Sequence, residues 1–198
     1  MLLWQSDAVD DLVGMQKPLR RLTEAAEAVA ELERAVPAFA ALRFAVPVDL
    51  DWSKLEAKLG LALPADYKLL CELFPTFELG HFMAFGGPDP GHEHLWLKGA
   101  REELEVIDEW LGYADLTVPM HTYPAPGGLL PWSTSNEGDI FLWSTGGEGP
   151  EEWTVTVASR NGAWWHYEGG VAQFMADLVG GRLELWGLPP VSCEVNAR

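Results

Sequence analysis

Hydrophobic and polar residues alternate in short runs over residues 128–167. The segment reads GLLPWSTSNEGDIFLWSTGGEGPEEWTVTVASRNGAWWHY, and clusters of turn-forming residues separate its aromatic and β-branched runs about every ten residues. Such a pattern is typical of consecutive antiparallel strands joined by tight turns. It predicts a β-meander at the centre of the fold.

Helical periodicity surrounds this meander. Apolar residues over 18–36 recur at spacings of three, four and seven, with Pro18 suited to the first turn. Asp51 is a candidate N-cap for a second helix that ends at Gly60, and Pro64 can open a third over residues 65–74. Two more helices are predicted over residues 100–111 and 171–178.

The remaining segments give weaker patterns. Residues 81–85 and 93–97 are predicted to be strands joined by the turn-rich loop GGPDPGH. Residues 1–17 can form either a short amphipathic helix or an arm packed on the domain. Past residue 183, the chain is expected to be mobile unless Leu185 and Trp186 dock.

These elements predict an α+β fold, in which an antiparallel-dominated sheet packs against helices. The chain has 198 residues, of which 48% are hydrophobic, enough for one globular domain with a full core. We expect an N-terminal helical extension over residues 1–48, a main domain over 49–183 and a C-terminal tail over 184–198.

The charge balance is strongly acidic. Lys and Arg total 13 against 30 Asp and Glu, which gives a formal net charge of -17. From Glu102 onward, fifteen acidic residues face three basic ones. A negative field of this strength disfavours nucleic acid and anionic membranes and favours a basic protein partner. The alternative is that the charge serves only to keep the protein in solution.

The cysteines and the hydrophobic runs bear on location. Cys71 and Cys193 are far apart and lack the spacing of a metal site. The N-terminal residues do not resemble a secretory signal, and no apolar run reaches the roughly twenty residues needed to span a bilayer. A reducing cytoplasm is therefore the expected location.

Three segments resemble a known family. WSKLEAKLGLALPADYKLLCELF, over residues 52–74, resembles the opening motif of the SMI1/KNR4 (SUKH) superfamily, with a helix ending in LG before an LP-x-D-Y helix. LLPWSTSNEGDIFLW, over 129–143, resembles the family's strand, turn and strand, and VAQFMADL, over 171–178, its closing helix with a Phe facing the sheet. The resemblance implies a SUKH-like fold and an immunity protein that binds and blocks a bacterial toxin, often a nuclease or deaminase. It also extends to regulatory proteins of cell-wall control and signalling.

Candidate catalytic and metal sites are poorly supported. His92 and His94 would share one side of a strand, but zinc needs at least a third ligand and second-shell support. Cys71 lies on an apolar helical stripe, and no G-x-S-x-G nucleophile motif is present. Paired carboxylates such as Glu137 with Asp139 leave a hydrolase open as an alternative. We expect no enzyme activity, no cofactor and no metal.

The candidate partner-binding residues come from the meander. Its turn acids are expected to steer a basic partner, and its tryptophans are candidate anchors. Adjacent Trp164 and Trp165 must face opposite sides of a strand, so one reaches an outer surface unless a flanking helix buries it. The predicted function is a non-enzymatic protein-binding domain, with a toxin-neutralising immunity protein ahead of a regulatory scaffold; the oligomeric state stays open. The candidate residues are Trp132, Glu137, Asp139, Trp143, Glu148, Glu151 and Glu152.

Overall fold

The predicted meander occupies the middle of an eight-stranded sheet in the computed structural model, which describes residues 11–198. The strand order is β1-β7-β6-β5-β4-β3-β2-β8. Neighbouring strands are antiparallel, except that β1 lies parallel to β7. The predicted α+β fold with an antiparallel-dominated sheet is confirmed. The strands are β1 (Leu12–Gln16), β2 (Phe77–Leu79), β3 (Met83–Phe85), β4 (Leu129–Ser135), β5 (Ile140–Ser144), β6 (Thr154–Ala158), β7 (Trp164–Tyr167) and β8 (Val195–Ala197).

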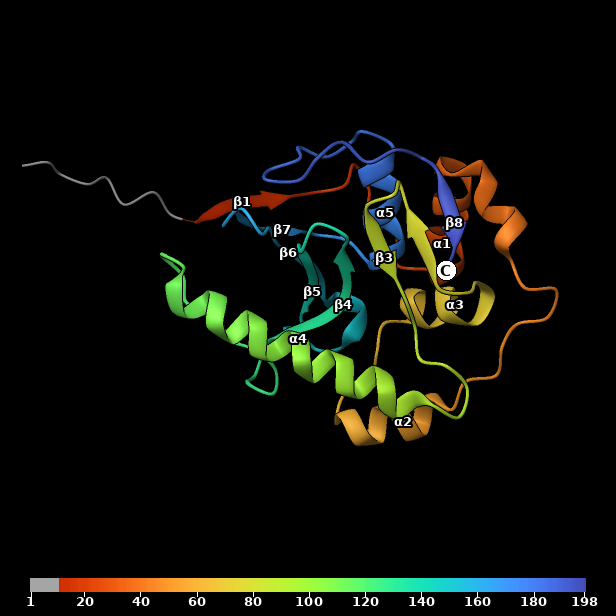
Figure 1. Ribbon diagram of the computed structural model, residues 1–198, viewed down its shortest axis with the longest axis horizontal. Coiled ribbons are helices and arrows are strands. Elements are labelled where there is room, and N and C mark those ends of the chain that lie inside the picture. The colour runs from red at the N-terminus through yellow and green to blue at the C-terminus, as the bar shows by residue number, and fades with distance from the viewer. Residues whose placement is uncertain (1–10) are drawn as a thin grey trace, which may run out of the picture.

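Helices cover both faces of this sheet (Figure 1). The helices α1, α3 and α5 build the larger core on one face, and the C-terminal half of α4 packs on the other face through Ile107. Figure 1 shows α4 crossing the lower part of the view, with the sheet between it and α1 and α5. The helices are α1 (Ala25–Ala35), α2 (Trp52–Leu59), α3 (Ala65–Leu73), α4 (Glu93–Tyr113) and α5 (Val171–Val179), with short 3-10 helices at Pro37–Leu42 and Pro150–Glu152.

The alternation of side chains in the meander assigns its residues to the two cores. In β5, Phe141 faces the larger core, whereas Ile140 and Leu142 face α4. Trp164 and Trp165 likewise face opposite sides, and both are buried. Because both faces are covered, neither tryptophan reaches an outer surface.

Local signals placed α2 and α3 correctly. The Asp51 carboxylate accepts a hydrogen bond from the Lys54 N–H at 3.0 Å, which caps α2. Gly60 ends the helix in the left-handed conformation, with φ of 83°. Pro64 precedes α3, which begins at Ala65 as predicted.

The first helix starts later than its pattern suggested. The prediction of helix from Pro18 is wrong, because α1 begins at Ala25. Gln173 of α5 explains the difference: its side chain donates to the Arg20 carbonyl at 2.7 Å and accepts from the Leu22 N–H at 2.9 Å. These bonds satisfy the Arg20 carbonyl and the Leu22 N–H, so the segment before α1 can remain extended without the hydrogen bonds of a helix.

The predicted strand at residues 93–97 is also wrong, because this segment forms the first turns of α4. Leu95 is exposed while Leu97 is buried, as expected where apolar residues serve different faces of a helix. The strand predicted at 81–85 exists as β3, but its hairpin partner is β2, on its N-terminal side, with Phe77 opposite Phe85.

The terminal segments of the described chain pack on the rest of it. The helix α1 of the predicted N-terminal extension contacts α5 and α3, and residues 1–10 of that extension lie outside the described part. Leu185 packs against the larger core, and the Trp165 ring N–H donates to the Trp186 carbonyl at 2.9 Å. The tail was expected to be mobile only if Leu185 and Trp186 did not dock, and both contact the domain. Further along the tail, β8 pairs with β2.

Candidate partner-binding surface

The tryptophans predicted as anchors do not reach the surface. Trp132 is 3% exposed and Trp143 is 2% exposed. Trp143 packs edge-on against Tyr67 with ring centroids 4.9 Å apart, and Trp132 packs edge-on against Phe174 at 6.1 Å. Their prediction as anchors is wrong, because alternation along β4 and β5 points both rings into the core.

Asp139 is a structural turn residue. It is almost fully buried, and its carboxylate accepts from the Ser135 hydroxyl at 2.5 Å and from the Arg160 N–H at 3.0 Å. These bonds tie the β4–β5 turn to the β6–β7 turn. The prediction that Asp139 faces a partner is wrong for this reason.

The turn acids that do reach the surface belong to separate places. Glu137 lies in the β4–β5 turn, where its carboxylate is 3.4 Å from the Arg160 guanidinium. Glu148, Glu151 and Glu152 lie in the β5–β6 connection, at the opposite end of β5. Five extended residues separate these ends by roughly 17 Å. The predicted acids therefore do not form one patch.

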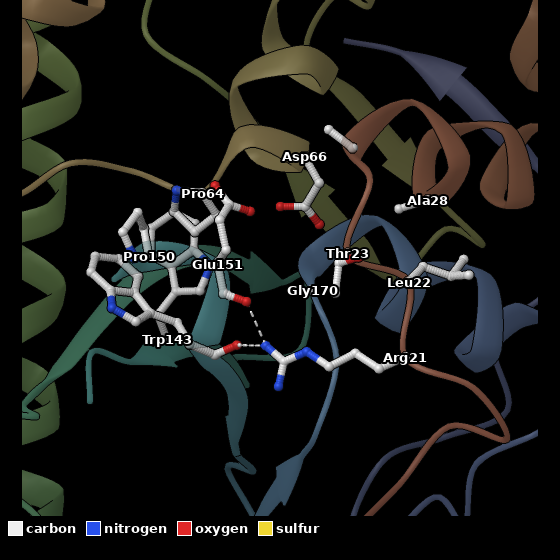
Figure 2. Close-up of a pocket in the computed structure, with 12 residues that line it drawn as sticks. Arg21, Leu22, Thr23, Ala28, Pro64, Asp66, Trp143, Pro150, Glu151 and Gly170 are labelled. Atoms are coloured by element: carbon white, nitrogen blue, oxygen red, sulfur yellow. Dashed lines mark hydrogen bonds between the residues drawn. The ribbon is translucent and has the colours of Figure 1, made fainter. Parts of the chain in front are cut away.

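Arg21 holds the β5–β6 connection against the helical layer, as Figure 2 shows. Its guanidinium donates to the backbone carbonyls of Glu151 at 2.7 Å and Trp153 at 3.1 Å. The Glu151 carboxylate in turn accepts from the Ala65 N–H at 3.0 Å, at the start of α3. The cavity between these residues has a volume of about 20 Å³, room for a water molecule but not for a larger ligand.

Asp66 lies beside this cavity and joins the first turns of α3 and α5. Its carboxylate accepts from the Tyr67 N–H at 2.8 Å and from the Ala172 N–H of α5 at 3.0 Å. Burial raises the pKa of Asp66 and the nearby charge of Glu151 adds to this, while the N–H donors act in the opposite direction. Gly170 is needed here, because a Cβ atom at that position would lie 2.5 Å from the Asp66 carboxylate.

Replacing Asp66 with asparagine is expected to lower the free energy of unfolding by about 1–3 kcal/mol, because the amide nitrogen would face one of the two N–H donors. The loss should depend on pH. Because the pKa of Asp66 is higher in the folded than in the unfolded protein, protonation of this carboxyl favours the folded state. This contribution to the free energy of unfolding is complete below the ordinary pKa of 3.8 and is lost as pH rises through the pKa of the folded state. The difference between wild type and variant should therefore shrink as pH rises, in urea unfolding measured from pH 4 to 7. A difference that grows with pH would contradict this.

The other candidate reactive groups are Cys71, His92 and His94. Burial raises the pKa of the Cys71 thiol far above its ordinary value, which opposes formation of a nucleophilic thiolate. His92 and His94 are exposed, with ring centroids 6.3 Å apart. Within residues 11–198, no three His, Cys, Asp or Glu side chains are grouped so that they could hold a metal ion. No helix in that part of the chain is long and apolar enough to cross a membrane.

A different surface combines exposed apolar side chains with acids. On α4, Leu95 is 54% exposed, Val106 38% and Tyr113 83%. Glu102 and Glu109 fall between them at helical spacing, so the five side chains share one face, turned away from the buried Ile107 side. We call this face, made of Leu95, Glu102, Val106, Glu109 and Tyr113, the α4 outer stripe.

The acids on and beside the stripe are mostly unneutralised. Lys98 pairs with Glu102 at 3.3 Å, but both side chains are largely exposed, so water screens the pair. In the described chain, Glu105 and Glu109 have no basic side chain within ion-pair distance. An exposed aromatic and aliphatic row bordered by negative charge suits a basic protein surface.

Sequence reasoning missed this stripe although it had located part of the helix. The predicted helix over residues 100–111 covers only part of α4, because Leu95 falls in the predicted strand over 93–97 and Tyr113 lies beyond the predicted end. The spacing of eleven between Leu95 and Val106, and of seven between Val106 and Tyr113, was the available signal. Comparisons of the chain with protein-family models, curated proteins and solved structures found no match.

Proposed function

We propose that this protein is a non-enzymatic binding domain that recognises a basic protein through the α4 outer stripe. The observation that carries the proposal is the row of exposed apolar side chains along α4. Among the described residues, the neighbouring Glu105 and Glu109 have no basic partner, and Glu102 pairs only with the exposed Lys98. Tyr113 takes the place of the buried tryptophans as the anchor. Its ring combines a large apolar area with a polar hydroxyl, as residues that dominate interface energies often do.

The charge of the stripe has a kinetic role. A negative surface attracts a positive partner over distances of about a Debye length and orients it before contact, which raises the association rate constant. The same field repels phosphate groups, so nucleic acid and anionic membranes are poor ligands for this face. Glu137, Glu148, Glu151 and Glu152 add to the overall field from other parts of the surface.

We further propose that the partner is a toxin and that the protein acts as its immunity protein. Support comes from the resemblance of three segments to the SUKH superfamily. A toxin that acts on nucleic acid, such as a nuclease or deaminase, presents a basic surface to its substrate, which an acidic stripe can cover. Two free thiols, buried Cys71 and exposed Cys193, support a reducing cytoplasm as the location.

Charge reversal on the stripe tests this function. The double variant Glu102→Lys/Glu109→Lys is expected to lower the association rate constant for toxin domains encoded by neighbouring genes by about ten- to a thousandfold at low salt. The difference should narrow as salt screens the charges. Stopped-flow binding and rescue of cell growth on co-expression with the toxin measure the two consequences.

The control is Glu137→Lys/Glu148→Lys, which makes the same change in net charge at the two ends of β5. It should slow association much less, because its charges lie away from the stripe. An equal loss in both variants would show that only the total charge matters and would overturn the assignment to α4. If the wild-type protein neither binds nor neutralises any such toxin, the immunity function is wrong.

A further inference from the structure

A groove runs beside the α4 outer stripe, between α4 and the strands β3 and β4. Its volume is about 210 Å³, large enough for one long side chain of a partner. Glu103 carries the only charge among the described residues that line it. Those residues are Ala84, Gly86, Trp96, Gly99, Ala100, Glu103, Pro131, Trp132, Ser133 and Thr134.

Gly99 keeps the helical wall of the groove open. It lies inside the 21-residue helix α4, where glycine is less favourable than alanine. A Cβ atom at Gly99 would meet nothing within 4 Å, so packing within the described protein does not require glycine there. Its absent side chain leaves space that a ligand can occupy.

The polar groups of the groove are suited to a cation. Glu103 is partly buried and has no basic side chain within ion-pair distance among residues 11–198. Burial raises the pKa of Glu103, and the charge of Glu102 adds to this effect. The Ser133 hydroxyl donates to the Ala84 carbonyl at 2.9 Å, so its oxygen remains able to accept a hydrogen bond.

Trp96 adds a surface on which a planar cation can stack. The indole is half-buried and lines the same groove as Glu103. A guanidinium can lie against an aromatic ring while its edge donates to a carboxylate, whereas an ammonium offers no plane to stack.

We propose that this groove takes an arginine side chain of the basic partner, with the guanidinium between Trp96 and Glu103 and within reach of the Ser133 oxygen. The inference rests on the proposed function, since it names the group that the partner inserts beside the stripe. It gives the interface specificity for one residue type, which steering by charge alone does not provide.

A small-molecule titration tests the groove without the partner. N-acetyl-arginine amide, added to the full ¹⁵N-labelled chain, is expected to cause saturable shifts of the Gly99, Glu103 and Thr134 amide signals. N-acetyl-lysine amide should bind several-fold more weakly. Glu103→Gln should weaken binding of the arginine probe about tenfold. Shifts that do not saturate, or equal binding of the lysine probe, would overturn the proposal.

Two glycines of α4 supply a matched pair of variants. Gly99→Leu fills the groove and should abolish the arginine-dependent shifts, while Gly112→Leu, at an equally open position outside the groove, should leave them unchanged. Both variants should remain folded, as urea unfolding can verify. Equal binding by wild type and Gly99→Leu would contradict the proposal.

The outcomes separate this inference from the proposed function. If the wild-type protein neutralises a toxin through the stripe but the arginine probe leaves the groove signals unchanged, the groove assignment fails and the function stands. If the probe saturates the groove but toxins encoded by neighbouring genes are neither bound nor neutralised, the immunity function fails and the groove remains an arginine site.

Discussion

Replacing Phe174 with alanine is expected to lower the free energy of unfolding by about 3–5 kcal/mol. The ring is fully buried and lies at the centre of the larger core. Its centroid is 5.8 Å from Phe141, 5.9 Å from Trp165 and 5.5 Å from Tyr167. Two strands, β5 and β7, contribute these rings, so the cavity left by the substitution cannot be filled by a shift of one side chain.

Urea unfolding monitored by tryptophan fluorescence and by circular dichroism measures this loss. Leu19→Ala is the control, because Leu19 is a large apolar residue that is fully exposed, and its truncation should change stability by less than about 0.5 kcal/mol. A loss below about 1.5 kcal/mol for Phe174→Ala would show that the surrounding rings repack, contrary to the expectation.

The second large effect is expected at Asp177. Its carboxylate accepts from the Tyr167 hydroxyl and from Nε of Arg182, each at 2.5 Å. Arg182 also donates to Glu31 of α1 at 3.1 Å. These contacts join β7, α1, α5 and the segment that follows α5, and Asp177 itself is buried.

Asp177→Asn is expected to destabilise the protein by about 3 kcal/mol, because the amide nitrogen must face one of two donors and Arg182 loses its buried counter-charge. This loss of stability is at the low end of the range for breaking a buried ion pair. The reason is that the Arg182 side chain is 39% exposed, so water can stabilise its charge. Urea unfolding at pH 7 measures the change.

A double-mutant cycle with Tyr167→Phe isolates the hydroxyl contact. The single variant Tyr167→Phe should lose only about 1 kcal/mol, since the pair of Asp177 and Arg182 remains. The two losses should not add in the double variant, because both remove the same hydrogen bond. Strict additivity would show that the Tyr167 hydroxyl contributes nothing through Asp177.

Much of the fold was predictable because its signals are local. Alternation along β5 and β6, the capping carboxylate of Asp51 and the left-handed Gly60 each depend on a few neighbouring residues. The helix predicted over residues 171–178 is likewise present as α5, with Phe174 in the larger core. Periodicity and capping reflect backbone geometry, so they are present in the sequence itself.

Features that depend on distant segments were not predictable. Nothing near Pro18 shows that Gln173 will bond the backbone of the segment before α1, and nothing near Trp143 shows that α3 will cover it. The burial of a tryptophan and the pairing of an acid depend on which element packs against them. For this reason, the meander and its exposed turn acids were located correctly, while Trp132, Trp143 and Asp139 were predicted at the surface and are buried.

The strand order has a consequence for how the sheet opens. The strands β4, β5, β6 and β7 follow one another in sequence and pair in that order. By contrast, β1 and β8 pair at the two margins of the sheet with strands that are far from them in sequence, β7 and β2. Closing such long loops has a large entropic cost, so both margins should form last and exchange their amide hydrogens first under native conditions. Release of β8 would uncover the backbone of β2, a free edge on which another chain can add a strand. The Arg198 N–H donates to the Thr76 carbonyl at 2.9 Å and its guanidinium donates to the Asn136 side chain at 3.2 Å, so these bonds help to hold β8 over that edge.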